Sequence, residues 1–564
     1  MESEQLRKKK NTTTWYRLLD YVIIPLLIII VAYQPGYKDG FIDHFEAGKE
    51  LACVNELSYG KVICKDIFTQ FGPLNTYLQA FFMFLFGKNL SVLRSYFYCG
   101  TLLTLIAGYL IGLSLCRRHF FSYILPLILI FETYHPFWAT RWGGFRFAFG
   151  LLAIFGAIKF FAKKKKIWIL LAGVFGATAL LITQDVGVLS IISVGFTICL
   201  YLYFAFIEDK EFLWPPLIFF SIGIAIILAP FFMYFIFNGA FIPYIMTTLT
   251  VVTTHSSVWA QKNMDLVLLK AFKNSKNIFS FNFKIFFPIL LYGCYAIYLL
   301  KKMSAKKGVS RDYGLMCLFV YGVLMYIASM RRVEGPQFQI ALQPAMILTV
   351  VFLDRALERV VQLKKNIKDN NNFVKIAALG GVLLFMSYYV VNSEKRFYGS
   401  FSSWVRYQGQ KKDFMPFYLE AIPISRMKLY SLTISRAKGV EIPVQQAPEI
   451  EGVTKYILSV TKQGEKVFTF PEHGIYNFLA DRPCIDRFNI AGYAWTTPEY
   501  RKELLEDLEK SKPRYIIYGR ELSNMAMAIN RKKELLPEVI EYINKNYEKE
   551  ISFGSIDILK RKGM

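Results

Sequence analysis

Long apolar stretches recur along most of this chain and alternate with short polar segments. Each stretch approaches the roughly 20 residues that an α-helix needs to cross the hydrocarbon of a bilayer. The pattern therefore predicts membrane-spanning helices at these positions, in chain order: 18–34, 91–115, 120–138, 147–162, 167–182, 187–207, 213–237, 282–300, 312–330, 339–357 and 374–392. We expect a polytopic α-helical membrane protein with about 11 transmembrane helices.

The segment Leu74–Phe86 is apolar but too short to span comfortably. Its length of about 14 residues gives roughly 21 Å as a helix, and the hydrocarbon is about 30 Å thick. If this segment crossed the membrane, the next clusters of basic residues would fall outside. We therefore expect a juxtamembrane or re-entrant helix within a long first external loop.

Composition and charge support the same topology. The chain is 54% hydrophobic with a net charge of +25, and its mean hydropathy is +0.33. The cations occur in short clusters between apolar stretches, as in cytoplasmic loops, and no soluble basic domain is present to bind nucleic acid. We predict a multi-pass protein of the plasma or inner membrane, embedded in membrane lipids, with a cytoplasmic N-terminus and an extracytoplasmic C-terminus.

The pattern divides the chain into three predicted domains. Residues 1–392 carry the apolar spans, 393–446 form an amphipathic connector, and 447–564 form an extracytoplasmic α/β domain. In the last part, short strands and helices alternate, which favours a small and mostly parallel sheet. Because this part lacks a glycine-rich phosphate loop, we expect a structural or acceptor-facing role for it.

Two cysteines, Cys53 and Cys64, fall in the first external loop. In an oxidising compartment they could form a disulfide that closes a short loop. Two free thiols fit the sequence equally well, so both interpretations stay open.

Unusual polar residues gather on the predicted external face. The first loop supplies Asp43, His44 and Asp66. The later external loops supply the remaining candidates: Arg141, Arg146, Gln184, Asp185, His255, Arg331, Arg332, Glu334 and Gln337. Charged groups at membrane depth are costly, so they usually mark function or pair with one another.

Carboxylates and arginines together indicate a particular chemistry. A carboxylate such as Asp43, supported by Asp66, can deprotonate an acceptor hydroxyl or amine. Arg331 and Arg332 place two cations outside against the usual charge pattern, and their forked guanidinium groups suit phosphate oxygens. The combination fits transfer of a group from a lipid-linked phosphate donor.

Structural explanations stay open for several of these residues. Asp43 could be a solvated loop carboxylate, and Asp66 could be a turn residue or a helix cap. Arg141 and Arg146 could contact lipid head groups or helix-end carbonyls. Asp185 could form an ion pair with one of these arginines.

The order and sidedness of these motifs resemble the GT-C superfamily of membrane glycosyltransferases, especially the protein O-mannosyltransferase and lipid A aminoarabinose-transferase branch. The resemblance covers roughly residues 15–360. The matching features, in chain order, are an acid after the first span (Asp43), a Lys-Asp…Gly-Pro-Leu stretch (Lys65 to Leu74), a short helix ending Leu85-Phe86-Gly87 with Arg94 beyond it, Arg141 to Arg146, Gln184-Asp185, and Arg332 to Gln337 followed by Pro344.

The resemblance implies a sugar carried on polyprenyl phosphate or diphosphate and an extracytoplasmic lipid, polysaccharide or protein as acceptor. Asp43 matches the first-loop catalytic acid of the family, and Arg331 or Arg332 matches its contact to the donor phosphate. His44 stands where the family more often has a second acid, so a requirement for a divalent metal stays open. His255 fits a loop residue better than a metal ligand.

A flippase or transporter of lipid-linked glycans is the main alternative. Transporters tend to show internal repeats and polar residues near the bilayer midplane. Here the charges lie mainly at external span ends and no repeat is visible. A membrane-anchored binding protein is a third interpretation, in which the C-terminal domain alone would act.

Overall fold

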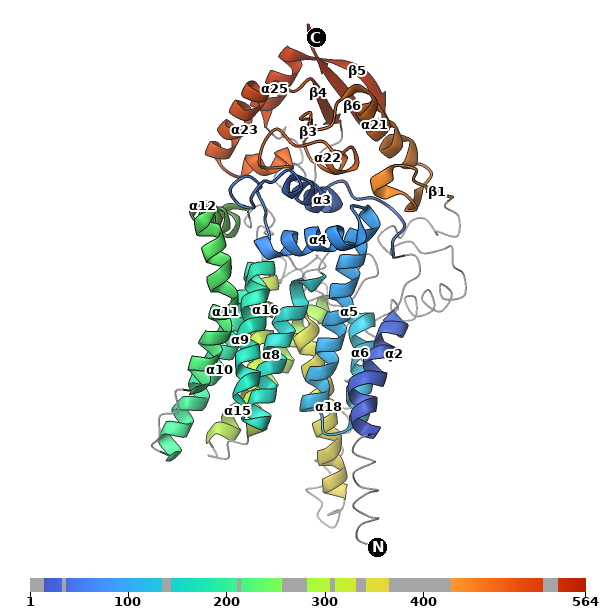
Figure 1. Ribbon diagram of the computed structural model, residues 1–564. Coiled ribbons are helices and arrows are strands. Elements are labelled where there is room, and N and C mark those ends of the chain that lie inside the picture. The colour runs from blue at the N-terminus through green and yellow to red at the C-terminus, as the bar shows by residue number, and fades with distance from the viewer. Residues whose placement is uncertain are drawn as a thin grey trace.

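The computed structural model describes residues 15–32, 37–133, 144–209, 215–255, 281–304, 310–330, 341–364, 428–520 and 536–563. Within these ranges, long helices run side by side as a bundle, and a unit of helices and strands covers one end of it (Figure 1). The helices α3 (Glu46–Leu57) and α4 (Pro73–Phe86) lie crosswise between the two parts.

A helix occupies every predicted span that reaches into the described residues, whereas 374–392 lies outside them. The bundle consists of η1 (Leu19–Ile23), α2 (Ile24–Ala32), α5 (Leu90–Leu115), α6 (His119–Thr133), α8 (Phe145–Lys163), α9 (Lys166–Ile182), α10 (Gln184–Asp209), α11 (Pro215–Phe237), α15 (Phe281–Ser304), α16 (Ser310–Ser329) and α18 (Gln343–Lys364). Among described residues, five helices are long and apolar enough to cross a membrane: α5, α8, α10, α11 and α16. The total of about 11 spans stays a prediction.

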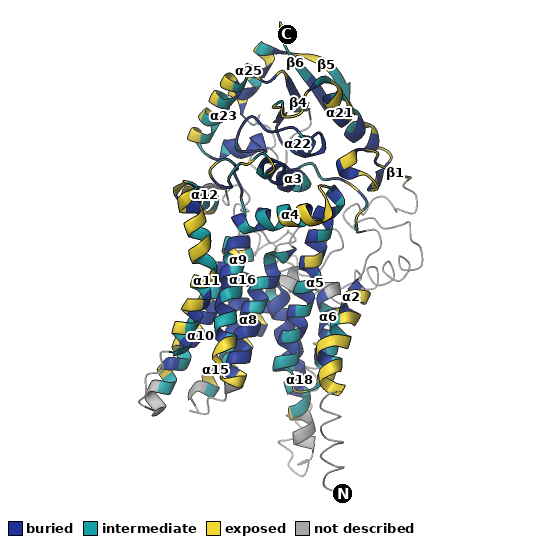
Figure 2. Ribbon diagram, in the orientation of Figure 1, coloured by how far each residue is buried: buried dark blue, intermediate teal, exposed yellow. Residues whose placement is uncertain are grey.

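Small residues let the bundle helices approach closely. A Cβ atom on Gly173 of α9 would lie 2.2 Å from the carbonyl oxygen of Phe220 in α11. Reciprocally, a Cβ atom on Gly223 of α11 would lie 2.1 Å from the carbonyl oxygen of Leu170. Close backbone contact of this kind drives helix packing where lipid removes the hydrophobic force between helices. The outward side of α11 is instead exposed and apolar (Figure 2), as expected of a lipid-facing surface.

The predicted short helix at 74–86 is α4, and it lies across the end of the bundle (Figure 1). Its polar residues Asn75 and Gln79 are buried, whereas Phe84 and Phe86 are 83% and 69% exposed. Helix α12 (Phe241–Thr250) lies near the same end of the bundle, at the end of α11. Exposed apolar residues at this level suit the boundary between hydrocarbon and head groups.

The C-terminal unit contains a four-stranded mixed sheet with the order β3-β4-β6-β5. Strand β3 (Phe468–Phe470) is parallel to β4 (Tyr515–Gly519), but β6 (Ile556–Arg561) is antiparallel to both β4 and β5 (Tyr547–Phe553). The predicted mostly parallel sheet is therefore wrong. The reason is β5, which the sequence pattern did not reveal and which returns through a tight turn at Gly554, φ +56°, to form a hairpin with β6.

Helices cover this sheet. They are α21 (Ala447–Val460), α22 (Ile475–Leu479), α23 (Pro498–Ser511) and α25 (Pro537–Asn546), with 3₁₀ turns η5 (Ser435–Ala437) and η6 (Ala491–Thr496). Helix α23 starts with a threonine cap: the Thr497 hydroxyl accepts a hydrogen bond from the backbone N–H of Tyr500 at 3.2 Å.

Residues 428–446, which the sequence places in the connector, pack with the C-terminal unit. Strands β1 (Leu429–Ser431) and β2 (Glu441–Pro443) pair antiparallel. Apolar residues in and between these strands share one hydrophobic core with α3 and the sheet. This core includes Leu51, Val54, Leu432, Ile442, Ile450, Ile475 and Ile558. The predicted domain boundaries stay predictions, but the first loop and the C-terminal unit have a common core.

Glycines bring α3 into direct contact with α22. A Cβ atom on Gly48 would lie 3.1 Å from the backbone nitrogen of Ile475, and one on Gly474 would lie 3.1 Å from Cβ of Ala52. Both helices are buried (Figure 2). The first loop is therefore fixed against the C-terminal unit on one side and against the bundle on the other.

Candidate functional site

Asp43 lies three residues before helix α3, and its side chain caps the start of the helix. Its Oδ1 accepts hydrogen bonds from the backbone N–H groups of Phe45 and Glu46, both at 2.9 Å, and its carbonyl oxygen accepts one from Ala47 at 3.1 Å. This is the geometry of an N-terminal cap, in which a carboxylate satisfies N–H groups that lack a partner within the helix. Oδ2 accepts no hydrogen bond from the part of the chain that the structure describes. Among the described residues, Asp43 thus combines a fixed backbone with one carboxylate oxygen that accepts no hydrogen bond.

Asp66 holds a tight turn in the same loop. Its Oδ2 accepts a hydrogen bond from Val62 N at 2.9 Å, and its own N–H donates to Val62 O at 2.8 Å. The neighbouring Lys65 ammonium donates to the carbonyl of Asn238 at 3.1 Å, which ties the loop to the end of α11. The turn interpretation of Asp66 is confirmed, and a supporting part in catalysis stays a prediction.

One face of α3 carries three charged residues whose spacing of three and four positions places them together: Glu46, Lys49 and Glu50. Lys49 is 6% exposed and forms an ion pair with Glu46. Glu50 accepts hydrogen bonds from Asn75 Nδ2 at 3.1 Å and Gln79 Nε2 at 2.7 Å, both on α4. Burial raises the pKa of Glu50, and the charge of Lys49 partly offsets this.

Phe71 connects this face of α3 to the bundle. The Lys49 ammonium and the Arg146 guanidinium each lie 5.0 Å from the centroid of its ring. Such cation–π contacts hold both cations next to the aromatic ring. Arg146, in the first turn of α8, also pairs with Asp185 at the start of α10, at 3.1 Å. The predicted pairing of Asp185 with one of two arginines is confirmed for Arg146, and the pair lies beside helix α3.

His44 contacts the C-terminal unit. Its Nε2 lies 3.2 Å from Oε1 of Glu449 in α21. The other carboxylate oxygen of Glu449 accepts hydrogen bonds from the N–H and the hydroxyl of Ser555, each at 2.8 Å. Burial alone would raise the pKa of Glu449, but the hydrogen bonds from His44 and Ser555 outweigh it and lower the pKa to about 2.

His473 lies beside this pair. The centroid of its ring is 5.2 Å from that of His44. Gly519, at the end of β4, leaves room for the ring, because a Cβ atom there would lie 2.0 Å from it. Burial, with a contribution from the nearby His44, lowers the pKa of His473 to about 3. His473 is therefore neutral in the folded protein at ordinary pH.

The neutral state of His473 predicts an acid-dependent loss of stability. Between pH 6.5 and about 3, the unfolded chain binds a proton that the folded protein excludes, so the folded state loses stability as the pH falls. We expect wild type to lose on the order of 1.4 kcal/mol per pH unit relative to His473→Gln in this window. Apparent Tm values of both proteins from pH 7 to pH 4.5 check this, and parallel curves would contradict it.

That comparison is needed because other groups titrate in the same range. Burial raises the pKa of Asp486 to about 6, so its contribution to stability has the opposite dependence on pH. Because Asp486 is present in both proteins, its contribution cancels in the difference in stability between wild type and His473→Gln.

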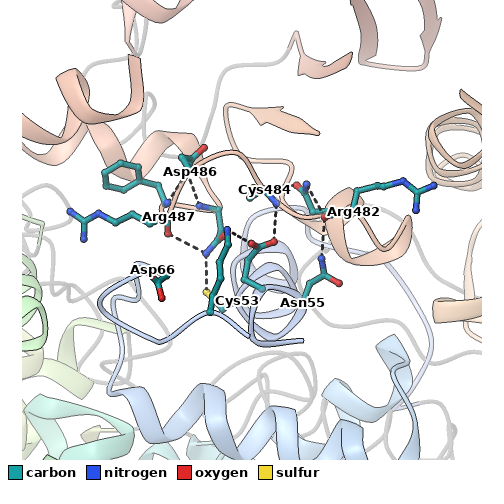
Figure 3. A network of polar contacts seen from close by, with 12 residues as sticks. Cys53, Asn55, Asp66, Arg482, Cys484, Asp486 and Arg487 are labelled. Atoms are coloured by element: carbon teal, nitrogen blue, oxygen red, sulfur yellow. Dashed lines mark hydrogen bonds and ion pairs between the residues drawn. The ribbon is translucent and has the colours of Figure 1, made fainter. Parts of the chain in front are cut away.

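A second network joins α3 to the C-terminal unit (Figure 3). The Asn55 amide donates to the carbonyl of Arg482 at 3.1 Å, and Glu56 Oε1 accepts from Cys484 N at 2.8 Å. Nearby, the N–H of Phe68 donates to the carbonyl of Arg487 at 2.6 Å. These contacts fix the far end of α3 and the loop that carries Asp66.

Cys53 and Cys64 are both free and buried. The Cys53 thiol donates a hydrogen bond to the carbonyl oxygen of Phe68 at 3.7 Å, and its sulfur accepts one from the Asn489 amide at 3.7 Å. Of the two interpretations that the sequence left open, the structure has the free thiols.

Several predicted site residues lie outside the described residues: Arg141, Arg331, Arg332, Glu334 and Gln337. His255 ends the short π-helix η2 (Val251–His255), and its side chain is also outside the described part. Gln184 begins α10 next to Asp185. Among the described side chains, no three of His, Cys, Asp or Glu are grouped to hold a metal ion. The predicted roles of these residues stay predictions.

The sequence reasoning missed Lys49, Glu50 and Glu449. Helix α3 had a signal that could have revealed the first two: an acidic cap at Asp43 followed three residues later by Glu46 is the spacing of a capping box. For Glu449 we find no such signal, because its role depends on a contact with a distant part of the chain.

Solved structures share this arrangement of helices and C-terminal unit. ArnT from Cupriavidus metallidurans bound to undecaprenyl phosphate matches 95% of this chain over 97% of its own, with a TM-score of 0.53 and 11% identity. The oligosaccharyltransferase AglB from Archaeoglobus fulgidus, in complex with an inhibitory peptide and a dolichol-phosphate, matches 98% of this chain over 75% of its own, with a TM-score of 0.52 and 12% identity. Both belong to the GT-C superfamily. This chain has the GT-C fold.

The assignment of the GT-C fold rests on the similarity of structures and not on the similarity of sequences. The apo form of the same ArnT also matches, over 97% of this chain and 98% of its own, with a TM-score of 0.52 and 11% identity. No protein-family model matches the sequence, and no curated protein matches it significantly. The resemblance predicted from the motifs is confirmed at the level of the fold.

Proposed function

We propose that this protein is an integral-membrane glycosyltransferase that transfers a sugar from a polyprenyl-phosphate-linked donor to an extracytoplasmic lipid, polysaccharide or protein. The placement of Asp43 carries the proposal. The Oδ2 atom of Asp43 accepts no hydrogen bond from the described residues, and its Oδ1 caps a helix that lies beside the Arg146–Asp185 pair at the end of the bundle. The ArnT and AglB structures hold undecaprenyl phosphate and dolichol-phosphate, which supports a donor of the same class.

In this proposal Asp43 is the general base. Its Oδ2 accepts the proton of an acceptor hydroxyl or amine while the acceptor atom bonds to the anomeric carbon of the sugar. The bond from that carbon to the phosphate oxygen breaks, and the phosphate keeps the electron pair. Attack from the face opposite the phosphate inverts the anomeric configuration. General-base catalysis of this kind contributes about 10²- to 10⁴-fold to the rate.

Arginines stabilise the departing phosphate in the same scheme. We assign the main contacts to Arg331 and Arg332, whose guanidinium groups can donate two parallel hydrogen bonds to phosphate oxygens. Arg141 would add positive charge nearby. Arg146 would contribute less, because it is already paired with Asp185.

Reconstitution tests the proposal directly. Purified protein in liposomes is given a labelled polyprenyl-phosphate sugar together with candidate acceptors. We expect free polyprenyl phosphate to appear in step with labelled acceptor. Movement of the labelled lipid between leaflets without any transfer product would instead identify a flippase.

The phosphate contacts predict a second result. Replacing Arg331 or Arg332 by alanine should lower kcat/KM for the donor about 100-fold, because a donor to the developing negative charge is lost. Lysine should restore only part of the activity, since it cannot form the forked contact. Arg118→Ala, which removes an arginine from the opposite end of the bundle, is the matched control. Equal activity of all variants would show that Arg331 and Arg332 do not contact the donor phosphate.

A further inference from the structure

The segment that carries Asp43 is attached to the C-terminal unit by residues 441–449. The N–H of Gly40 donates to the carbonyl of Glu441 at 2.6 Å, and the N–H of Glu441 donates to Asp39 Oδ1 at 2.9 Å. These residues are about 400 positions apart in the chain, so the attachment is a tertiary contact between the first loop and the C-terminal unit.

Gln446 makes the contact nearest to Asp43. Its Oε1 accepts a hydrogen bond from Ile42 N at 2.9 Å, and its Nε2 donates to Ile42 O at 2.7 Å. One side-chain amide therefore pairs with both backbone polar groups of Ile42, much as an antiparallel neighbouring strand would. Because Ile42 is fully buried, its N–H and carbonyl groups would destabilise the folded protein if they lost their hydrogen-bond partner.

Glu449 makes the contact on the other side of Asp43, through His44. The carboxylate is itself fixed by Ser555 and by the turn at Gly554, where a Cβ atom would lie 2.5 Å from Glu449 Oε2. The turn of the β5–β6 hairpin thus fixes the position of the Glu449 carboxylate, which contacts His44.

The opposite side of the segment is held by the bundle. Arg94 of α5, which is 3% exposed, donates hydrogen bonds to the carbonyls of Gly40 at 3.3 Å and Phe41 at 3.1 Å. The residues before Asp43 therefore lie between a cation of the bundle and an amide of the C-terminal unit. Their position depends on both.

We propose that Gln446 and Glu449 are positioning residues for the transfer reaction. From the C-terminal unit they hold the residues on each side of Asp43, so that its Oδ2 keeps one place relative to the end of the bundle. The inference rests on the proposed function for the role of Asp43. It gives the C-terminal unit a part in catalysis without contact to the reacting atoms.

Gln446→Ala tests the first contact, and its neighbour provides a matched control. Gln445 is exposed, and its side chain forms no hydrogen bond with any described residue. In full-length protein we expect Gln446→Ala to speed amide hydrogen exchange at residues 40–47 and to lower kcat roughly 10- to 100-fold, with the donor KM unchanged. Gln445→Ala should behave as wild type. Unchanged exchange, or faster exchange with unchanged kcat, would overturn the proposal.

The second contact is tested by a double-mutant cycle. His44→Gln and Glu449→Gln each remove the contact between the imidazole and the carboxylate, and the glutamine at 449 keeps an oxygen that can accept from Ser555. If the two residues act through one contact, the double variant should lower kcat no further than either single variant. Multiplied effects, or a lowered Tm with kcat unchanged, would show separate or purely structural roles and overturn the proposal.

These outcomes separate the inference from the function on which it rests. If Asp43→Asn abolishes transfer while Gln446→Ala and Glu449→Gln leave kcat unchanged, the proposed function stands and the inference fails. If wild type transfers no sugar, the proposed function fails together with the catalytic role of both residues, and hydrogen exchange then reports only on the contact.

Discussion

Asp43→Asn is expected to lower glycosyl transfer about 10²- to 10⁴-fold while leaving helix α3 intact. Asparagine caps a helix as well as aspartate does, so its side-chain oxygen can still accept from the N–H groups of Phe45 and Glu46. It cannot accept a proton from the acceptor, because an amide is not a base at neutral pH. Initial rates with saturating donor, together with the apparent Tm, check this expectation.

Two further variants separate capping from chemistry. Asp43→Ala should lose the same activity and also lower the Tm, because removal of a helix cap costs about 1 kcal/mol. Asp66→Asn should keep much of the activity, because Asp66 mainly holds a turn. If Asp43→Asn transferred sugar at half the wild-type rate or more, the general-base assignment would be wrong.

Gly72→Ala is expected to disrupt the site through the backbone. A Cβ atom at this position would lie 2.1 Å from the carbonyl oxygen of Leu181 and 2.4 Å from its carbon, at the end of α9. The backbone conformation of Gly72, φ −62°, is open to any residue, so the restriction is one of space. The contact is also anchored by the hydrogen bond from Gly72 N to Ile182 O at 3.0 Å. Alanine must therefore push α4 and Phe71 away from the bundle.

We expect this displacement to destabilise the protein by about 3 kcal/mol and to lower transfer roughly 100-fold. Gly293→Ala in α15 is a suitable control, because a Cβ atom there meets nothing within 4 Å. Alanine in place of that helical glycine should leave the Tm unchanged or raise it slightly. A Gly72→Ala protein as stable and active as Gly293→Ala would show that α4 tolerates displacement.

The bundle could be predicted from the sequence because lipid imposes a simple rule. A segment such as 91–115 must be apolar over most of its length, here all but its start at Arg94, and it appears as α5, Leu90–Leu115. Helix α3 was missed because it is short and carries charges at Glu46, Lys49, Glu50 and Glu56, so its apolar residues form no obvious run. Only its cap pattern marked it.

The sheet could be predicted only in part. Strands β3 and β4 are buried and apolar, and β6 starts with the buried residues Ile556 to Ile558, so these three strands can be recognised. Strand β5 lies at the edge and starts Tyr547-Glu-Lys-Glu, with the three charged residues exposed. Charged side chains are usual on edge strands because they prevent pairing with other chains, but they hide the strand from a search for apolar residues. Because β5 was missing from the prediction, the sheet was expected to be mostly parallel, whereas β6 is antiparallel to both of its neighbours.

The contacts that hold the site could not be predicted. Gln446 binds the backbone of Ile42, which any residue at position 42 would offer, so the sequence gives no sign of the pairing. The same holds for Phe68 and the carbonyl of Arg487. By contrast, an ion pair between Asp185 and either Arg141 or Arg146 could be predicted, because opposite charges at helix ends on one face need partners, and Arg146 is the arginine that forms it.

A structure determined with bound polyprenyl phosphate tests the central claim most directly. The account predicts the phosphate at the end of the bundle that faces α3 and α4, with guanidinium nitrogens of Arg331 or Arg332 about 2.8 Å from its oxygens. The Asp43 carboxylate should face the same space, with room for a sugar between it and the phosphate. A phosphate bound at the opposite end of the bundle, or near the middle of the membrane away from these arginines, would contradict it.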